Sequence, residues 1–573
     1  MRQIFISLGL LIFLCSFSTD SIKTYPQDYF RSPVGGPIFL SGTFGELRPN
    51  HFHAGIDIKA NKGKVGQDLY AAADGYISRI KVASGGYGNV LYINHPNGYT
   101  TVYAHMHRFT DQVAKFIKEA QYNKQNFEIE LFPAANQFVF KKGEVIGKLG
   151  ISGRSFGPHL HFEIRDSRTE KPINPMLFGF KINDKIAPML NELKVYFLND
   201  KLNTLNTKTY KVQKASGNNY RIYGDTLNLG AWRAGFGIKT YDKMNGVPNW
   251  NGVYNVEMYE EDELTYRYTM ESFAFSESRY INAHLDYEEQ VADKSYFNRC
   301  FRLPGNKLSI YEEAASKGLV KLSTQKASKI TMKAFDVEGN ESTLEFWVKR
   351  GKVKEPESEP FNYLLLFDEE NVIDNNSIYI HFPLGTFYEN LYMKYHSSRD
   401  DSQNVYSMVY HIHDYKTPVH RYYELGIEAE NLPDSLRSKA FIAYCGTDQK
   451  MENCGGRWKA GKLTVMVRDL GDFCIMVDQE APTIIPVNFK SNMKGFSKMT
   501  FKIKDNYKTT GKATDLKYRA TVDGNWILME YDAKKDLLTY RFDDKIATGQ
   551  HTVRLSVTDD RENERIFERA FTR

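Results

Sequence analysis

Histidines in three short strings of the first third of the chain constrain its fold most strongly. The strings are HFHAGIDI, TTVYAHMH and GPHLHFEIRD, which contribute His53 and Asp57, then His105, then His159 and His161. Because alternate residues of a β-strand point to one face, His159 and His161 should project together into one site. Two imidazoles and a carboxylate around an open fourth position commonly hold a catalytic zinc ion. Two histidines remain for acid–base chemistry, so the strings predict a zinc-dependent hydrolase.

Chain length and composition indicate several β-rich domains. At 573 residues the chain exceeds what one hydrophobic core usually serves, so about three or four domains are expected. The 37 Tyr and 37 Phe residues accompany many short runs of Val, Ile and Thr, which favours strands. Lysine and arginine form no run of the kind typical of nucleic-acid binding, so nucleic acid is not an expected partner.

The N-terminus has the features of a secretory signal peptide. A basic start is followed by the apolar run Ile4–Cys15 and by small residues before Thr19, which predicts a signal peptide over residues 1–18. A membrane span needs about 20 apolar residues, and no stretch of the chain is that long and apolar. Leu14 occupies the place before Cys15 where lipidation favours a small residue, so a lipid anchor is not expected. The mature protein is expected to be exported, to the periplasm or the extracellular space.

Export changes how the remaining cysteines are interpreted. Cys445 and Cys454 are close enough in sequence for a local disulfide in an oxidising compartment, but Cys300 and Cys474 allow other pairings. None of these four residues lies near the histidine strings. A cysteine-ligated metal is therefore not expected at the predicted site.

Residues 35–180 have the pattern of an antiparallel sheet with one inserted helix. Apolar segments alternate with glycine-containing turns through most of this range. The segment 110–125 differs, because apolar residues recur there at helical spacing behind a cap at Thr110 or Asp111. The sequence therefore predicts a helix over the sheet, within a domain of residues 19–183.

A weak internal repeat marks the rest of the chain. DKIAPMLNELKVYFL at Asp184 resembles DQEAPTIIPVNFK at Asp478, and each is followed downstream by a strand with an acidic turn, ITMKAFDVEGNES and HTVRLSVTDDRENER. Such modules fit immunoglobulin-like β-sandwiches. The charged, proline-containing KVKEPESEP is the best linker. The expected parts are an Ig-like β region (184–351), a linker (352–360), a β-rich domain (361–477) and an Ig-like sandwich (478–573).

Over roughly residues 35–175, the three strings together resemble the M23 family of zinc metallopeptidases, the lysostaphin- or LytM-type peptidoglycan endopeptidases. The resemblance implies that His53, Asp57 and His161 bind Zn²⁺ and that His105 and His159 are the catalytic histidines. It also implies an antiparallel β-sheet peptidase domain. The string LGISG departs from the family's usual Gly-x-Thr-Gly, and the inserted helix is longer than in minimal members.

The resemblance implies an exported zinc endopeptidase that cleaves peptide cross-links of bacterial peptidoglycan, with peptide stems as substrate and zinc-activated water as nucleophile. The alternative is a non-catalytic LytM-like module that binds or activates another cell-wall hydrolase. Such modules characteristically lose zinc ligands or catalytic histidines, and this chain has all five. A biotinyl- or lipoyl-like carrier barrel, suggested by AAADGYISRI and KKGEVIGKLG, needs a lysine at a hairpin tip and fits export poorly. The sequence does not decide whether the β modules bind an envelope protein partner. It also does not decide whether residues 110–137 form an inhibitory lid.

Several other histidines are expected to be turn, loop or surface residues without a role in the predicted site. His95 and His107 are expected in turns or at the surface, and His51 in a loop. His411 and His413 form a second H-x-H pair without a nearby third ligand, which indicates a solvated strand face.

Overall fold

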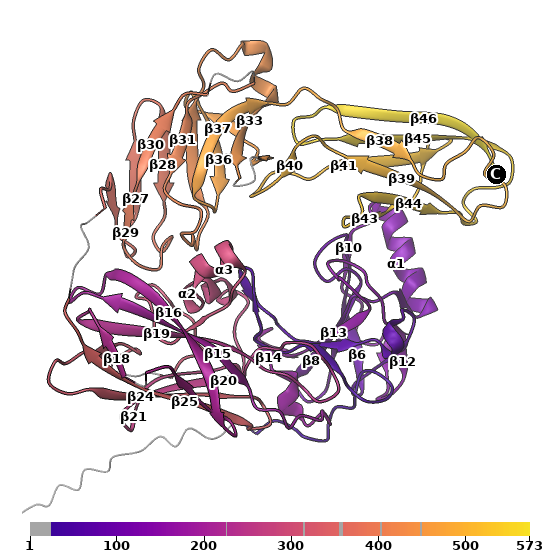
Figure 1. Ribbon diagram of the computed structural model, residues 1–573. Helices are drawn as coiled ribbons and strands as arrows, with labels where there is room; N and C mark the ends of the chain where they lie inside the picture. Colours follow the sequence, from indigo (N-terminus) through magenta and orange to yellow (C-terminus); the bar gives the residue numbers. More distant parts are fainter. Residues whose placement is uncertain (1–23, 225, 313–315, 354–358, 401–403, 447–449) are drawn as a thin grey trace, which may run out of the picture.

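The protein is described here as a computed structural model, which covers residues 24–573 except 225, 313–315, 354–358, 401–403 and 447–449 (Figure 1). The predicted signal peptide and most of the predicted linker lie outside the described residues. Strands make up 45% of the chain and helices 8%, so the predicted mainly β fold is confirmed. No helix among the described residues is long and apolar enough to cross a membrane.

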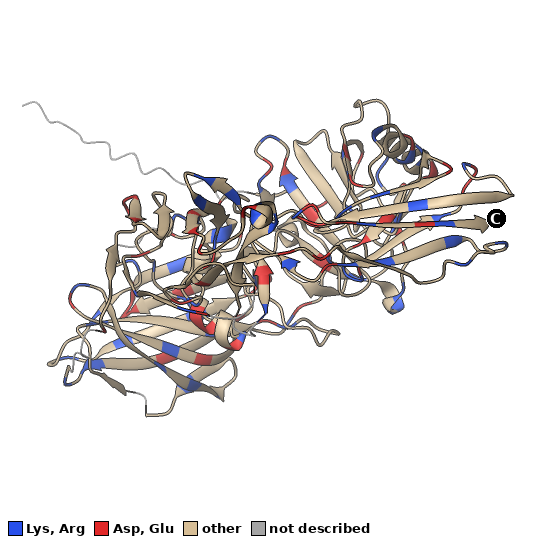
Figure 2. Cartoon of the chain, turned by 90° about the horizontal axis from the view of Figure 1, so that it is seen from above, with Lys and Arg blue, Asp and Glu red and all other residues tan. Residues whose placement is uncertain are grey.

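Four β-rich regions follow one another around a ring (Figure 1). The last region returns to the first, where β43 and β44 lie beside α1, and this contact includes an ion pair between Lys118 and Asp543 at 2.6 Å. Basic and acidic residues are interspersed along the chain, as Figure 2 shows.

The first region contains a nine-stranded antiparallel sheet. Its main path is β1 (Leu40–Gly42), β4 (Ile56–Lys59), β13 (His159–Asp166), β8 (Tyr99–Ala104), β7 (Val90–Asn94), β6 (Gly75–Val82) and β10 (Ile129–Leu131), with β11 (Val139–Phe140) and β14 (Pro172–Ile173) at its sides. A second sheet contains β5 (Asp68–Tyr70), β12 (Val145–Lys148) and β9 (Arg108–Phe109). The sheets share one apolar core, which includes residues of β4, β8 and β13.

The predicted inserted helix is α1 (Asp111–Lys124). Thr110 is its N-cap, and Gln125 ends it in the left-handed conformation with φ of 47°. The buried side of α1 presents Val113 and Ile117 to the core of the first region. A hairpin of β2 (Leu47–Arg48) and β3 (His51–Phe52) and two 3₁₀ turns, Asn61–Gly63 and Pro175–Phe178, complete this region.

The second region is an eleven-stranded sheet whose core extends into the first region. Phe44, which precedes the β2–β3 hairpin, and Phe52, which lies in β3, are buried in this core. Phe52 also donates its backbone N–H to Ser278 Oγ at 2.9 Å. The hairpin is therefore held by the second region.

The strands of the second region are β15 (Met189–Leu198), β16 (Thr204–Ser216), β17 (Asn219–Ile222), β18 (Thr226–Leu229), β19 (Arg233–Tyr241), β20 (Asn255–Glu260), β21 (Glu263–Thr269), β22 (Asn298–Arg299), β23 (Val320–Lys321), β24 (Ser328–Phe335) and β25 (Glu341–Arg350). Its helices are the 3₁₀ turn Ser278–Tyr280, α2 (Ile281–His284) and α3 (Tyr287–Asp293).

The third region has a five-stranded and a six-stranded sheet around one core. The first sheet contains β27 (Asn371–Asp374), β28 (Ile378–Phe382), β32 (Tyr423–Glu428), β36 (Lys462–Val467) and β35 (Arg457–Lys459). The second contains β30 (Tyr395–Ser398), β31 (Val409–Ile412), β37 (Gly471–Val477), β33 (Ala440–Cys445), β34 (Met451–Asn453) and β40 (Lys508–Thr509). A pair of β26 (Tyr363–Leu365) and β29 (Leu391–Met393) and the 3₁₀ helix Asp434–Lys439 flank them.

The cysteines differ from the pairing that their spacing suggests. Cys300, Cys445, Cys454 and Cys474 are all free thiols, so the Cys445–Cys454 bridge that the sequence allows is not formed in this structure. The Sγ atom of Cys445 lies 4.0 Å from that of Cys474 instead. These two residues stand on the neighbouring strands β33 and β37, a pairing that sequence separation alone does not reveal.

The fourth region consists of two four-stranded sheets that share one core. One contains β38 (Thr483–Pro486), β39 (Lys498–Lys504), β44 (Leu537–Arg541) and β43 (Glu530–Asp532). The other contains β42 (Asn525–Trp526), β41 (Lys517–Val522), β45 (Gln550–Thr558) and β46 (Glu564–Thr572).

Candidate metal centre and catalytic histidines

The three histidine strings meet at the centre of the first sheet. Asp57 stands on β4 directly opposite His161 on the neighbouring strand β13. His161 is also opposite Ala104 of β8, so His105, which follows β8, lies at the same end of the sheet. His159 is two residues before His161 on the same strand, and His53 follows the β2–β3 hairpin. The structure thus brings together all five residues named from the sequence.

His53, Asp57 and His161 form a buried cluster. Their ligand atoms all lie within 4.8 Å of one another. His53 Nε2 and His161 Nδ1 are each 3.0 Å from Asp57 Oδ1 and 2.9 Å from each other. The three side chains are almost completely shielded from solvent.

Partners on the far side of each ring decide which nitrogen faces the cluster. His53 Nδ1 lies 2.7 Å from the carbonyl oxygen of Thr43, and His161 Nε2 lies 2.8 Å from Glu163 Oε1. Because these oxygens only accept hydrogen bonds, His53 Nδ1 and His161 Nε2 each carry a proton. His53 Nε2, His161 Nδ1 and Asp57 Oδ1 then direct electron pairs at one point. Such a donor set needs a positive charge at its centre, and it fits a metal ion.

The pKa shifts agree with this requirement. Burial lowers the pKa of His53 to about 4, although Asp57 opposes this shift. Burial also disfavours the charged form of His161, but hydrogen bonds to Asp57 and Glu163 outweigh it and raise its pKa to about 9. The pKa of Asp57 is held well below its usual range by His53 and His161, against the effect of burial. A proton on His161 can therefore supply this positive charge when no metal is bound.

Four further side chains support the cluster, and the sequence analysis missed all of them. Glu163 accepts from Arg165 Nε at 2.6 Å and from the Tyr87 hydroxyl. Arg48 Nη2 donates to Asp57 Oδ2 at 2.7 Å, which leaves Oδ1 to face the histidines. Alternation along β13 could have revealed Glu163 and Arg165, because they share the face of His161. Arg48 and Tyr87 have no comparable signal.

His105 and His159 stand side by side next to the cluster. Their ring centroids are 4.8 Å apart. His105 Nδ1 donates to the carbonyl of Ser152 at 2.8 Å, and His159 Nδ1 donates to the carbonyl of Gly157 at 2.9 Å. Each ring therefore keeps Nε2 for proton exchange, and His159 Nε2 lies 3.5 Å from Asp57 Oδ1.

The backbone and surroundings of His105 are unusual. Its φ of 59° is in the left-handed region, which is uncommon for a residue other than glycine and is enriched at functional sites. Burial, reinforced by His161 and His159, lowers the pKa of His105 to about 3. The ring is therefore a neutral imidazole at neutral pH.

The fourth region holds the loop that positions these histidines. Lys534 Nζ donates to the carbonyls of Ile151 and Ser155 at 2.7 and 3.2 Å. Ser152, between these two residues, is the partner of His105 Nδ1. A cavity of about 890 Å³ lies between the two regions, with Met106 in its wall on the side of the first region. Residues from opposite ends of the chain therefore meet beside the candidate site.

The remaining histidines lie outside the cluster. His95 is at a turn, as expected, but it is buried and bonded to the Asp74 carbonyl at 2.8 Å and to Thr101 Oγ1 at 2.7 Å. His107 is exposed, as expected, whereas His51 is exposed but lies in β3 instead of a loop.

Comparison with known proteins identifies the first and third regions. Residues 51–122 match the family described as Peptidase family M23, and residues 362–478 match the family described as Zu5-like domain. Over 124 residues the chain is 39% identical to the DD-carboxypeptidase/endopeptidase Mpg of Neisseria meningitidis, which is 22% of each protein. Over 153 residues it is 31% identical to the Murein hydrolase activator NlpD of Escherichia coli, 27% of this chain and 32% of that protein. The solved catalytic domain of the M23 protein EnpA from Enterococcus faecalis is 25% identical, with 27% of this chain and 97% of that chain covered and a TM-score of 0.19.

The N-terminal region therefore contains a peptidase M23 domain of the lysostaphin/LytM type, as the sequence motifs predicted. The third region is a β-rich, Zu5-like domain. The chain spans about a fifth (22%) of the length of the Neisseria relative that it matches.

Proposed function

We propose that the protein is an exported, zinc-dependent endopeptidase that hydrolyses peptide cross-links of bacterial peptidoglycan, in the periplasm or outside the cell. The observation that carries the proposal is the convergence of His53, Asp57 and His161 at one point, with His105 and His159 beside it. The relationship to M23 proteins named as endopeptidases supports the substrate class.

His53, Asp57 and His161 are the proposed zinc ligands. Zinc bound there would polarise the scissile carbonyl and lower the pKa of a water molecule. The chain prepares the site through Thr43 and Glu163, which fix the two imidazoles with their free nitrogens inward.

His105 and His159 are the proposed acid–base residues. Each ring has Nδ1 committed to a backbone carbonyl, so Nε2 is the atom that accepts or returns a proton. Peptide hydrolysis needs a proton taken from the attacking water and a proton given to the leaving nitrogen. Two imidazoles side by side can carry out both transfers. The burial of the site also strengthens its electrostatic interactions.

The test is hydrolysis of purified cross-linked peptidoglycan by the mature, full-length protein, with and without a zinc chelator, and with separation of the released muropeptides. We expect chelator-sensitive loss of cross-linked dimers. His161→Ala should lose both metal and activity, His105→Ala should keep the metal but lose turnover, and His107→Ala is the matched control because His107 is exposed in the same string.

Activity in metal-free His161→Ala protein would refute the assignment. No cleavage by zinc-loaded wild type would also contradict it, and would favour the alternative of a module that activates another hydrolase. That alternative is the role named for the NlpD relative. A matched assay, in which the protein is added to a separate cell-wall hydrolase, would then detect activation.

A further inference from the structure

Two clusters of three aspartates lie outside the peptidase site. Within each cluster, one carboxylate oxygen of each residue lies within 4.8 Å of the others. Each cluster begins with the aspartate of the repeated Asp-x-x-Ala-Pro string. The members are Asp184, Asp242 and Asp336 in the second region and Asp478, Asp505 and Asp559 in the fourth.

The first cluster is buried and incompletely bonded. Asp184 Oδ1 accepts from the backbone of Ile186 at 3.1 Å, and Asp336 is fixed by the backbone and side chain of Asn340 at 2.8 and 2.6 Å. Asp184 Oδ2 and Asp242 Oδ1 have no hydrogen-bond partner, although the two residues are only 8% and 2% exposed. A buried carboxylate oxygen without a partner is costly, so these two atoms indicate a missing ligand.

The second cluster repeats this arrangement nearly 300 positions later. Asp478 Oδ1 accepts from the backbone of Glu480 at 3.1 Å, and Asp559 is fixed by the backbone and side chain of Asn563, each at 2.8 Å. Asp478 Oδ2 and Asp505 Oδ1 again have no partner, and Asp478 is 1% exposed. The same atoms are thus left open in two separate folds.

Lysine, arginine and histidine side chains in the described part of the chain do not neutralise either cluster. Among the ion pairs of the described residues, none involves any of the six aspartates. Burial, followed by Asp184 and Asp336, raises the pKa of Asp242 to about 8. Burial, followed by Asp478 and Asp559, likewise raises the pKa of Asp505 to about 7. Like charges at this separation repel unless a proton or a cation lies between them.

We propose that each aspartate cluster binds one Ca²⁺ ion. Calcium takes carboxylate and carbonyl oxygens in flexible geometry, and the clusters offer only oxygen ligands. Calcium sites in extracellular modules typically have dissociation constants on the order of 10⁻⁴–10⁻³ M, which suits an exported protein. The proposal does not depend on the peptidase assignment.

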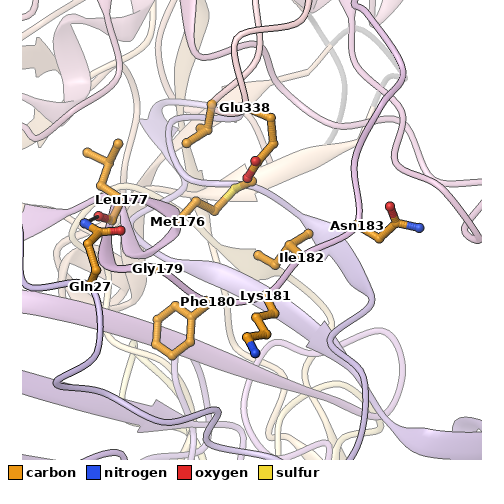
Figure 3. A pocket seen from close by; sticks show the side chains of 10 residues that line it. Gln27, Met176, Leu177, Gly179, Phe180, Lys181, Ile182, Asn183 and Glu338 are labelled. Atoms are coloured by element: carbon orange, nitrogen blue, oxygen red, sulfur yellow. Dashed lines mark hydrogen bonds between the residues drawn. The ribbon is translucent and has the colours of Figure 1, made fainter.

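Each cluster lies at a joint between regions. Asp184 directly follows the segment 176–183, which leaves the first region, and this segment lines a pocket of about 650 Å³ together with Glu338. Figure 3 shows the Glu338 side chain reaching toward Met176 across this pocket. Asp336 is two residues before Glu338, so an ion bound at the first cluster would tie the connecting segment to the exit of β24.

The second joint is built in the same way. Asp478 directly follows β37 of the third region, and its backbone N–H donates to the Lys439 carbonyl at 2.9 Å. Lys439 Nζ in turn donates to the carbonyl of Arg561, two residues after Asp559. Calcium at this cluster would therefore fix the fourth region against the third.

The test is calorimetric titration of zinc-loaded, otherwise metal-free full-length protein with CaCl₂ up to about 5 mM, a range chosen from the affinities above. Two equivalents should bind. Asp242→Asn and Asp505→Asn should each remove one equivalent, whereas Asp262→Asn and Asp544→Asn, in exposed positions of the same two regions, should remove none. His161→Ala should still bind two, which separates this result from the zinc site.

Thermal unfolding of the same variants gives a second readout, because the difference in unfolding temperature between wild type and Asp242→Asn should change when calcium is added. Without calcium, Asp242→Asn should unfold at the same or a higher temperature than wild type, because it removes a repelling charge. With 5 mM calcium, wild type should gain several degrees and Asp242→Asn should gain less. Absence of calcium binding by folded wild-type protein, or binding that both Asn variants retain in full, would overturn the proposal and leave shared protons as the explanation.

Discussion

Replacing Phe273 by alanine is expected to weaken zinc binding at the proposed metal centre, although Phe273 does not touch that centre. The Phe273 ring is 1% exposed in the core of the second region, with its centroid 5.1 Å from that of Phe44 and 5.5 Å from that of Phe52. These two residues adjoin Thr43 and His53, whose hydrogen bond orients one proposed zinc ligand. Truncation of a buried phenylalanine to alanine costs about 3–5 kcal/mol. If about 1.4 kcal/mol of this cost appears as weaker zinc binding through a misplaced His53, zinc affinity falls about tenfold.

The assay combines urea unfolding with competition for zinc against a fluorescent chelator. Phe346→Ala is the matched control, because Phe346 is also 1% exposed in the same core but packs edge-on against Phe236, with centroids 5.3 Å apart. Both variants should lose similar stability, and only Phe273→Ala should lose zinc affinity. Equal zinc affinity in the two variants would refute the idea that the second region supports the metal centre.

Three other predictions concern separate parts of the molecule. Glu163→Gln should lower zinc affinity about 10–100-fold in the same competition assay, because it weakens the group that orients His161, and unchanged affinity would contradict that role. Lys534→Ala should lower turnover about tenfold without changing zinc affinity, because it releases the loop beside the proposed catalytic pair, whereas Lys535→Ala should not. Burial lowers the pKa of His284 to about 3, below its unfolded value of about 6.5, so its contribution to stability is present above pH 6.5 and is lost as pH falls toward 3. His284→Leu should therefore make urea stability less dependent on pH between 6.5 and 4, and an unchanged slope would count against this.

Local patterns in the sequence account for much of the first region. Alternation on β13 predicted that His159 and His161 share a face, and helical spacing predicted α1 within one residue of its ends. Both signals depend on neighbours a few positions apart, which is the range over which strand and helix periods operate. The same alternation extends to Glu163, which shares the face of His159 and His161.

Contacts between distant parts of the chain could not be predicted in this way. Arg48 reaches Asp57 through a hairpin held by the second region, and no periodic pattern specifies that hairpin's position. The pairing of Lys534 with Ile151 joins residues 383 positions apart. The three-aspartate clusters could be predicted only in part. The repeated strings contain their first and last members, whereas the middle members are brought to the clusters only by folding.

The return of the fourth region to α1 makes their contact an intramolecular binding equilibrium. Its strength depends on the effective concentration of one surface near the other, which the intervening regions set through their length and stiffness. Surface contacts such as Lys118–Asp543 and Arg519–Gln125, at 2.6 and 2.7 Å, are individually weak, and a high effective concentration lets such contacts persist. Any partner that binds the third region and changes its angle to a neighbour would lower that concentration. It could thereby release the loop at Ile151 without touching the peptidase domain.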